Sequence, residues 1–158
     1  MSAASNYLED KLLDHVLRSP GAAFTAPSTL YVALFADNTA VPAAAAALEG
    51  GTSSTGETTN WGYYEINNAS YERRPITFAA AGLVTTGTIA SNATVTFPVA
   101  SADYQTAGTT GNIVTHLAII DDSTPSNVLF YGALTTPKTV SSGDQFTIST
   151  GNLSIALA

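Results

Sequence analysis

After residue 18 the chain consists of short extended segments separated by turn residues, and this pattern limits the possible folds more than any other feature. Several segments alternate apolar and polar side chains, as Leu153, Ile155 and Leu157 do, which is typical of a strand with one buried face. Others, such as Leu117–Ile120, are apolar throughout and predict strands that are covered on both sides. The candidate strands are Leu30–Phe35, Tyr71–Phe78, Thr94–Val99, Ile113–Ile120, Val128–Leu134, Gln145–Ser149 and Leu153–Leu157.

The order of these segments predicts a mainly β fold. Helices do not alternate with the strands, so a parallel α/β sheet is disfavoured and an antiparallel, jelly-roll-like β-sandwich is favoured. Ser142-Gly143-Asp144 and Thr150-Gly151-Asn152 predict hairpin turns that close the last strands. The length of 158 residues fits one domain covering residues 1–158.

Residues 7–18 predict one short helix at the N-terminus, because apolar side chains recur there at helical spacing. Asn6 is placed to cap this helix, and Ser19-Pro20-Gly21 is placed to end it. We expect the apolar stripe to dock onto the sheet or onto a neighbouring subunit. The stripe consists of Leu8, Leu12, Leu13, Val16 and Leu17.

Residues 36–62 predict a long polar loop. Ala43–Glu49 is compatible with a helical turn, but the following residues are rich in glycine, serine and threonine, which bury little apolar surface. A loop of this length is uncommon in a compact domain unless it has a function. We therefore expect a contact element that is dispensable for folding but needed for attachment to a partner.

The composition favours assembly with other proteins and disfavours two other kinds of partner. Charged residues make up 11% of the chain, against about 25% in typical soluble domains, so neutral polar side chains must cover much of the surface. The net charge is −7 and the five basic residues are scattered, which argues against nucleic-acid binding. The acidity and the frequent interruption of apolar stretches also argue against a membrane partner.

No sequence pattern indicates an enzyme, a cofactor or a catalytic residue. The chain has neither a nucleophile elbow nor a phosphate-binding glycine loop. It has no cysteine, which excludes disulfides, thiolate catalysis and cysteine-ligated zinc. His15 and His116 have no partner at a metal-ligand spacing, and we expect His116 to be a hydrogen-bonded residue at the edge of the core.

Asp121 and Asp122 follow a predicted strand, and two interpretations are open. They could bind calcium together with Asp103, Asp144 or Glu65, although no dedicated calcium loop is present. Adjacent carboxylates at the end of a strand more often cap the turn that follows. We therefore expect capping, with no metal ion.

An aromatic group and an arginine pair are the candidate protein-contact residues. The aromatic group follows the long loop, and either it belongs to the core or it forms a patch for protein or carbohydrate. Each arginine is expected to pair with an acid, either within the chain or on a neighbouring subunit. The candidates are Trp61, Tyr63, Tyr64, Tyr71, Arg73 and Arg74.

Several segments together resemble small virion proteins of tailed bacteriophages, which are labelled tail-fibre-like or decoration proteins. The resemblance covers most of the chain except residues 36–62. The segments that carry it are Asn6–His15, Leu30–Phe35, Tyr71-x-Arg73 before Ile76–Phe78, Val95–Pro98, Val114–Asp121, Leu129–Thr135 and Val140–Asp144.

This resemblance implies a β-sandwich subunit that forms a homo-oligomer, with a trimer as the state considered. It implies a place on the outer surface of a phage head, where the subunit would act as a cement protein and bind the major capsid protein of neighbouring capsomers. The alternatives are a tail, collar or tail-fibre-like component and, from another class, a carbohydrate-binding module. The start of the chain lacks the pattern of a signal peptide, so we expect synthesis in the host cytoplasm.

Overall fold

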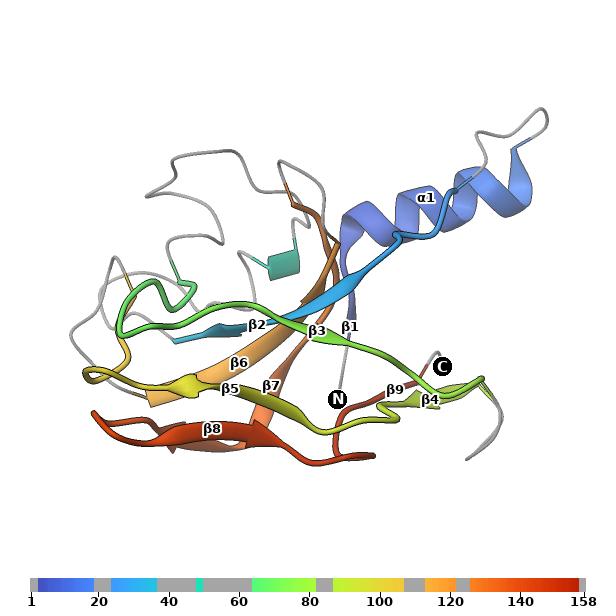
Figure 1. Ribbon diagram of the computed structural model, residues 1–158. Coiled ribbons are helices and arrows are strands. Elements are labelled where there is room, and N and C mark those ends of the chain that lie inside the picture. Colours follow the sequence, from blue (N-terminus) through green and yellow to red (C-terminus); the bar gives the residue numbers. More distant parts are fainter. Residues whose placement is uncertain are drawn as a thin grey trace.

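The computed structural model describes residues 3–18, 24–36, 48–49, 64–81, 87–106, 113–121 and 126–156. Over these residues the chain is mainly β, with antiparallel sheets and one named α-helix (Figure 1), which confirms the predicted fold class. The elements are β1 (Ala3–Ala4), α1 (Asn6–Leu17), β2 (Leu30–Phe35), β3 (Arg74–Ile76), β4 (Thr88–Ala90), β5 (Val95–Val99), β6 (Ile113–Ile120), β7 (Val128–Thr139), β8 (Gln145–Ile148) and β9 (Ser154–Ala156).

The strands form two layers. The larger sheet has five strands in the order β1-β7-β6-β2-β3, and each neighbouring pair is antiparallel. The second layer consists of two separate two-stranded ladders, β4 with β9 and β5 with β8. Figure 1 shows β5, β8 and β9 below the larger sheet, and the two layers enclose a core as in a β-sandwich. Jelly-roll connectivity stays a prediction, because this strand pairing does not establish it.

Both faces of the larger sheet are buried at its centre. Val32 and Leu34 of β2 point into the core between the two layers, whereas Ala33 and Phe35 point to the opposite face. A second cluster covers that face and includes the fully buried Leu48. Double coverage explains why β2 is apolar at every position and does not alternate.

A shift in the pairing of β6 with β7 changes which residues of β6 face the main core. Val114 pairs with Lys138 of β7, but His116 pairs with Ala133, so the register shifts between the two pairs. Val114, before the shift, and Leu117, after it, both pack at the main core. In a regular strand, residues on the same face are two or four positions apart, so this spacing of three shows that the shift turns the strand over. Both ends of β6 therefore contribute apolar side chains to the same core.

The N-terminal helix begins at Asn6 and is capped by Ser5, so the prediction of Asn6 as the cap is wrong. The Ser5 hydroxyl accepts a hydrogen bond from the backbone N–H of Leu8 at 3.3 Å and donates one to the carbonyl oxygen of Val128. The backbone N–H of Ser5 also donates to the carbonyl oxygen of Leu129 at 3.0 Å. These bonds to β7 fix Ser5 at the start of the helix, which is information that the local sequence does not contain.

Arg18 forms the C-terminal cap of α1, and its backbone N–H donates to the carbonyl oxygen of Asp14 at 3.3 Å. The predicted stop at Ser19-Pro20-Gly21 lies outside the described residues.

Several strand boundaries differ from the prediction. The segment Tyr71–Phe78 forms a ladder with β2 only over Arg74–Ile76, and β7 continues to Thr139 because it rejoins β6 beyond the shift. β1 and β4 were not predicted, because they have two and three residues and are too short to show a period-two pattern.

The two predicted hairpin turns are tight turns but do not join paired strands. Gly143 and Gly151 have φ angles of 90° and 80°, a left-handed conformation that favours glycine. The first turn leads from β7 to β8 and the second from β8 to β9, yet β8 pairs with β5 and β9 pairs with β4. The hairpin prediction is therefore wrong, because both turns connect strands that belong to different ladders.

The predicted loop 36–62 lies mostly outside the described residues. Ala36 is buried, and its backbone N–H donates to the carbonyl oxygen of Tyr64 at 3.0 Å. Leu48 and Glu49 are helical, in line with the helical turn expected there. Leu48 has 0% exposure and packs in the second cluster, so the start of this segment contributes to the core.

Candidate protein-contact surfaces

Two of the aromatic candidates lie in the interior. Tyr64 is 5% exposed and packs in the second cluster, beside Phe35 and Leu48. Tyr71 packs against the main core, where its ring stacks on Phe97 with a centroid distance of 5.9 Å. The other two candidates, Trp61 and Tyr63, lie outside the described residues. Tyr64 and Tyr71 therefore pack on opposite faces of the larger sheet and do not form one surface patch.

Arg73 and Glu65 form a two-pronged ion pair next to Tyr71. The Nε and Nη2 atoms of Arg73 each donate to one carboxylate oxygen of Glu65 at 2.7 Å. The Tyr71 hydroxyl donates to Glu65 Oε1 at 3.1 Å and accepts from the backbone N–H of Leu34 at 3.0 Å. Arg73 Nη1 also donates to Ser126 Oγ at 2.9 Å. This network ties the segment after the long loop to β2 and to the start of β7.

The electrostatics of this network favour fixed protonation states. Burial raises the pKa of the Tyr71 hydroxyl well above its ordinary value of 10.0, and the charge of Glu65 raises it further. Burial acts to lower the pKa of Arg73, but the hydrogen bond and the charge of Glu65 outweigh burial and raise that pKa. Neither Tyr71 nor Arg73 exchanges a proton near neutral pH, which suits a structural ion pair.

Arg74 differs from its neighbour because it lies nearer the surface. Its Nη1 atom is 3.5 Å from Glu72 Oε2, and the two side chains are 37% and 70% exposed. An exposed pair of this kind adds little to folding stability. Both arginines thus have an acid within the chain, which is one of the two arrangements expected.

The apolar stripe of α1 is only partly covered. Leu8 is 4% exposed and packs where the helix leaves β1, whereas Leu13, Val16 and Leu17 are 56%, 72% and 74% exposed. Figure 1 shows the helix extending away from the two layers. The sheet covers Leu8, and contact of the rest of the stripe with a neighbouring subunit stays a prediction.

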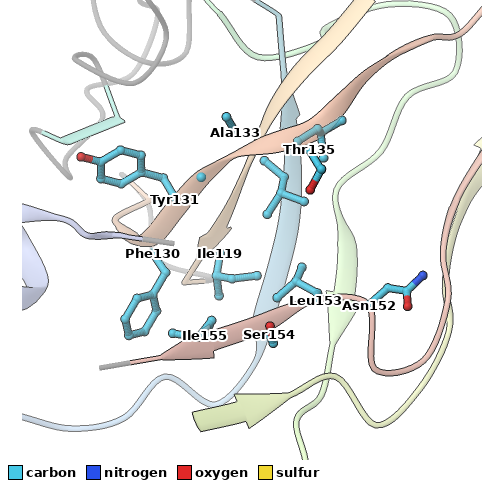
Figure 2. Close-up of a pocket in the computed structure, with 12 residues that line it drawn as sticks. Ile119, Phe130, Tyr131, Ala133, Thr135, Asn152, Leu153, Ser154 and Ile155 are labelled. Carbon is cyan, nitrogen blue, oxygen red and sulfur yellow. The ribbon is translucent and has the colours of Figure 1, made fainter. Parts of the chain in front are cut away.

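A groove separates β7 from the β8 and β9 segments of the second layer (Figure 2). It consists of two adjoining cavities of about 220 and 540 Å³. Figure 2 shows Ile119, Phe130 and Ile155 around the smaller cavity. The five residues that line both cavities are Leu117, Leu134, Thr135, Asn152 and Leu153. We call this feature the β7–β9 groove.

The β7–β9 groove is open because the two layers are not hydrogen-bonded to each other on this side. No ladder among the described strands joins β7 to β8 or β9, and β1 pairs with β7 only at Phe130 and Tyr131. Among the described residues, the lining contains one charged residue, Lys138, in a chain whose net charge is −7. The described lining therefore combines apolar and neutral polar side chains with one cation, on an acidic protein.

The polar residues considered as metal ligands are used in hydrogen bonds. Asp121 accepts two hydrogen bonds from Asn127, from its backbone N–H and its side-chain amide, both at 2.7 Å, and this is the expected capping arrangement. Asp122 lies outside the described residues. His116 is 9% exposed and its Nδ1 lies 2.9 Å from Thr115 Oγ1. In the described part of the chain, no group of three or more histidine, aspartate or glutamate residues could hold a metal ion.

Sequence reasoning missed two features of these surfaces. Glu65 was considered only as a metal ligand, and its pairing with Arg73 eight residues later requires the chain to turn back at Asn68–Ser70. The β7–β9 groove has no local sequence signal, because its walls come from separate strands. The sequence signal for this pair is an arginine next to a predicted strand, which indicates an acidic partner but not which one.

The described residues form an antiparallel β protein, and none of their helices has the length and hydropathy that a membrane-spanning helix needs. Residues 3–156 match the family described as "Podophage GP4 fiber I protein gp80". The chain belongs to this family and is a structural component of a bacteriophage virion. This match confirms the broad resemblance to phage virion proteins, including the segments on both sides of the long loop. No curated protein matches the chain.

Proposed function

We propose that this chain is a non-enzymatic subunit of an external fibre of a tailed phage, and that it binds other protein surfaces of the virion. The observation that carries the proposal is the match of residues 3–156 to a family described as a fibre protein. The structure adds support, because the charged side chains Glu65, Arg73 and Asp121 near the core are held in internal hydrogen bonds. A fibre subunit needs rigid packing and contact surfaces, and these are what the two layers and the projecting helix supply.

A capsid decoration role is the second candidate. The sequence contains neither internal repeats nor a fibrous stalk, which a fibre tip often has, and this observation favours a cement subunit on the head. Such a subunit would bind the major capsid protein and bridge neighbouring capsomers, gaining strength from several modest contacts made at once. The exposed threonines of β7 suit this role, because neutral side chains cost little to desolvate.

A carbohydrate-binding module has less support. The aromatic rings of Tyr64 and Tyr71 pack inside the protein, so these two residues do not offer a stacking platform for a sugar. Only Trp61 and Tyr63 of the original group stay as candidates for glycan or protein contact.

Labelling of intact virions tests the proposal. An antibody against the purified chain, followed by electron microscopy, should mark appendages at the tail in small, fixed numbers. Label spread evenly over the head would instead support the cement role, and absence of the chain from purified virions would contradict both. Rebinding of the purified chain to particles that lack it provides a second measurement. Trp61→Ala and Tyr63→Ala should weaken rebinding if these residues contact the partner.

A further inference from the structure

The helix α1 is short and has little packing within its own chain. It has 12 residues and buries one of them, Leu8, whereas isolated helices of about this length are marginal in water. Leu13, Val16 and Leu17 lie on adjacent turns and form a continuous exposed apolar stripe. Covering this stripe would provide the packing energy that the helix lacks.

The β7–β9 groove is a surface of mixed apolar and neutral polar side chains that the same chain leaves open. Its two cavities can accept large aliphatic side chains, and half-buried Leu117 and Leu134 lie in its wall. No residue of α1 lines the groove, and the helix extends away from the two layers (Figure 1). The stripe and the groove therefore do not meet within one copy of the chain.

Charge favours a second copy as the occupant of the groove. Glu9 lies four residues before Leu13, and Asp10 lies seven residues before Leu17, so both acids are on the stripe side of α1. Among its described residues, the groove contributes Lys138 and no carboxylate. The two acids beside the stripe thus meet a cation in the groove, although two copies with a net charge of −7 repel each other elsewhere.

The edge of β7 is less suited to an added strand than to a helix. Pro137 lacks a backbone N–H, and the shift in pairing between Lys138 and Ala133 distorts the ladder around it. Proline and bulges at a sheet edge oppose the regular hydrogen bonding that an incoming strand requires. A helix needs only the apolar wall and no backbone ladder.

We infer that the apolar stripe of α1 binds in the β7–β9 groove of a second copy of this chain. The contact joins two different surfaces, a helix and a groove. It can form twice within a two-fold dimer, or it can join each copy to two neighbours in a ring or a filament. The inference deepens the proposed function by naming the surfaces through which the fibre subunit self-associates.

The first test measures the mass of the purified chain by light scattering after size-exclusion chromatography. We expect an oligomer of the 16.2 kDa chain, and loss of this oligomer in Leu17→Lys, which places a cation in the stripe. The matched control is Lys11→Ala on the other side of the helix, which should keep the oligomer. A native chain that is monomeric at high concentration, or a Leu17→Lys variant of unchanged mass, would overturn the inference.

The second test blocks the groove. Thr135 is exposed and lines both cavities, so Thr135→Arg should abolish the oligomer, while Thr139→Arg on the same strand should not, because Thr139 lies outside the lining. Circular dichroism melting shows whether each variant is folded. If Thr135→Arg is unfolded, Lys138→Glu replaces it, and a mass equal to that of the native chain would count against the inference.

Mixing the variants separates this contact from a helix-to-helix dimer. The Leu17→Lys chain keeps its groove and the Thr135→Arg chain keeps its stripe, so an equal mixture should form a two-chain species with one working contact. A mixture that stays monomeric would overturn the helix-to-groove arrangement. Virion labelling tests the fibre location independently, so the failure of one proposal is distinguishable from the failure of the other.

Discussion

Replacing Glu65 with glutamine should reveal how much the buried ion pair contributes to stability. Glu65 accepts two hydrogen bonds from Arg73 at 2.7 Å and one from Tyr71 at 3.1 Å. Glutamine has nearly the same size as glutamate but carries no charge. Its amide nitrogen would face a guanidinium N–H, and because both groups are donors they cannot form a hydrogen bond with each other. The change therefore removes the ion pair and one hydrogen bond without leaving a cavity.

The structure sets the size of the expected effect. Removing one partner of a fully buried pair costs about 3–5 kcal/mol. Here the Glu65 side chain is 10% exposed but that of Arg73 is 34% exposed, so water can partly solvate the remaining guanidinium. We therefore expect a loss of about 2–3 kcal/mol, below the fully buried range. For a chain of this length that loss lowers the melting temperature by about 4–12 °C.

Thermal and urea unfolding at one fixed protein concentration measure this loss. The matched control is Glu72→Gln, which breaks the exposed pair with Arg74, where the two atoms are 3.5 Å apart. The control should lose less than about 1 kcal/mol. Equal losses in the two variants, or a loss below about 0.5 kcal/mol for Glu65→Gln, would refute the reasoning that burial and two-pronged geometry make this pair strong.

Three further predictions concern the core, the pH dependence and metal ions. Leu48→Ala should lower the free energy of unfolding, measured in urea, by about 2–5 kcal/mol, because Leu48 is fully buried. An unchanged free energy of unfolding would show that Leu48 does not pack in the core. Because the pKa of Tyr71 is raised above 10.0 in the folded state, the unfolded chain loses this proton first, so folding stability should fall as the pH rises above about 10. Tyr71→Phe should make that fall smaller in unfolding measurements at several pH values, and an unchanged fall would contradict the assignment. EDTA should leave the melting temperature unchanged. A decrease in melting temperature that calcium reverses would instead indicate that Asp121 is a metal ligand.

Local sequence patterns alone predicted much of the fold. The bounds of β2 and β6 agree with their apolar segments, and the helix was placed to within one residue at each end. Period-two alternation in β8 and β9 located their buried positions, such as Phe146 and Ile155. These properties depend on neighbouring residues, so the sequence of each segment contains them.

The pairing of the strands was decided by the tertiary structure. The turns at Gly143 and Gly151 were predicted as hairpins, but each connects two different ladders. The hydrogen bond from Ser5 to Val128 places the helix cap one residue before the predicted position. The ion pair of Arg73 is formed with Glu65 of the same chain. Leu48 joined the core from a segment whose composition is typical of a loop. Each outcome depends on residues that are far apart in the sequence or on opposite sides of a turn, and such contacts arise only when the layers pack together.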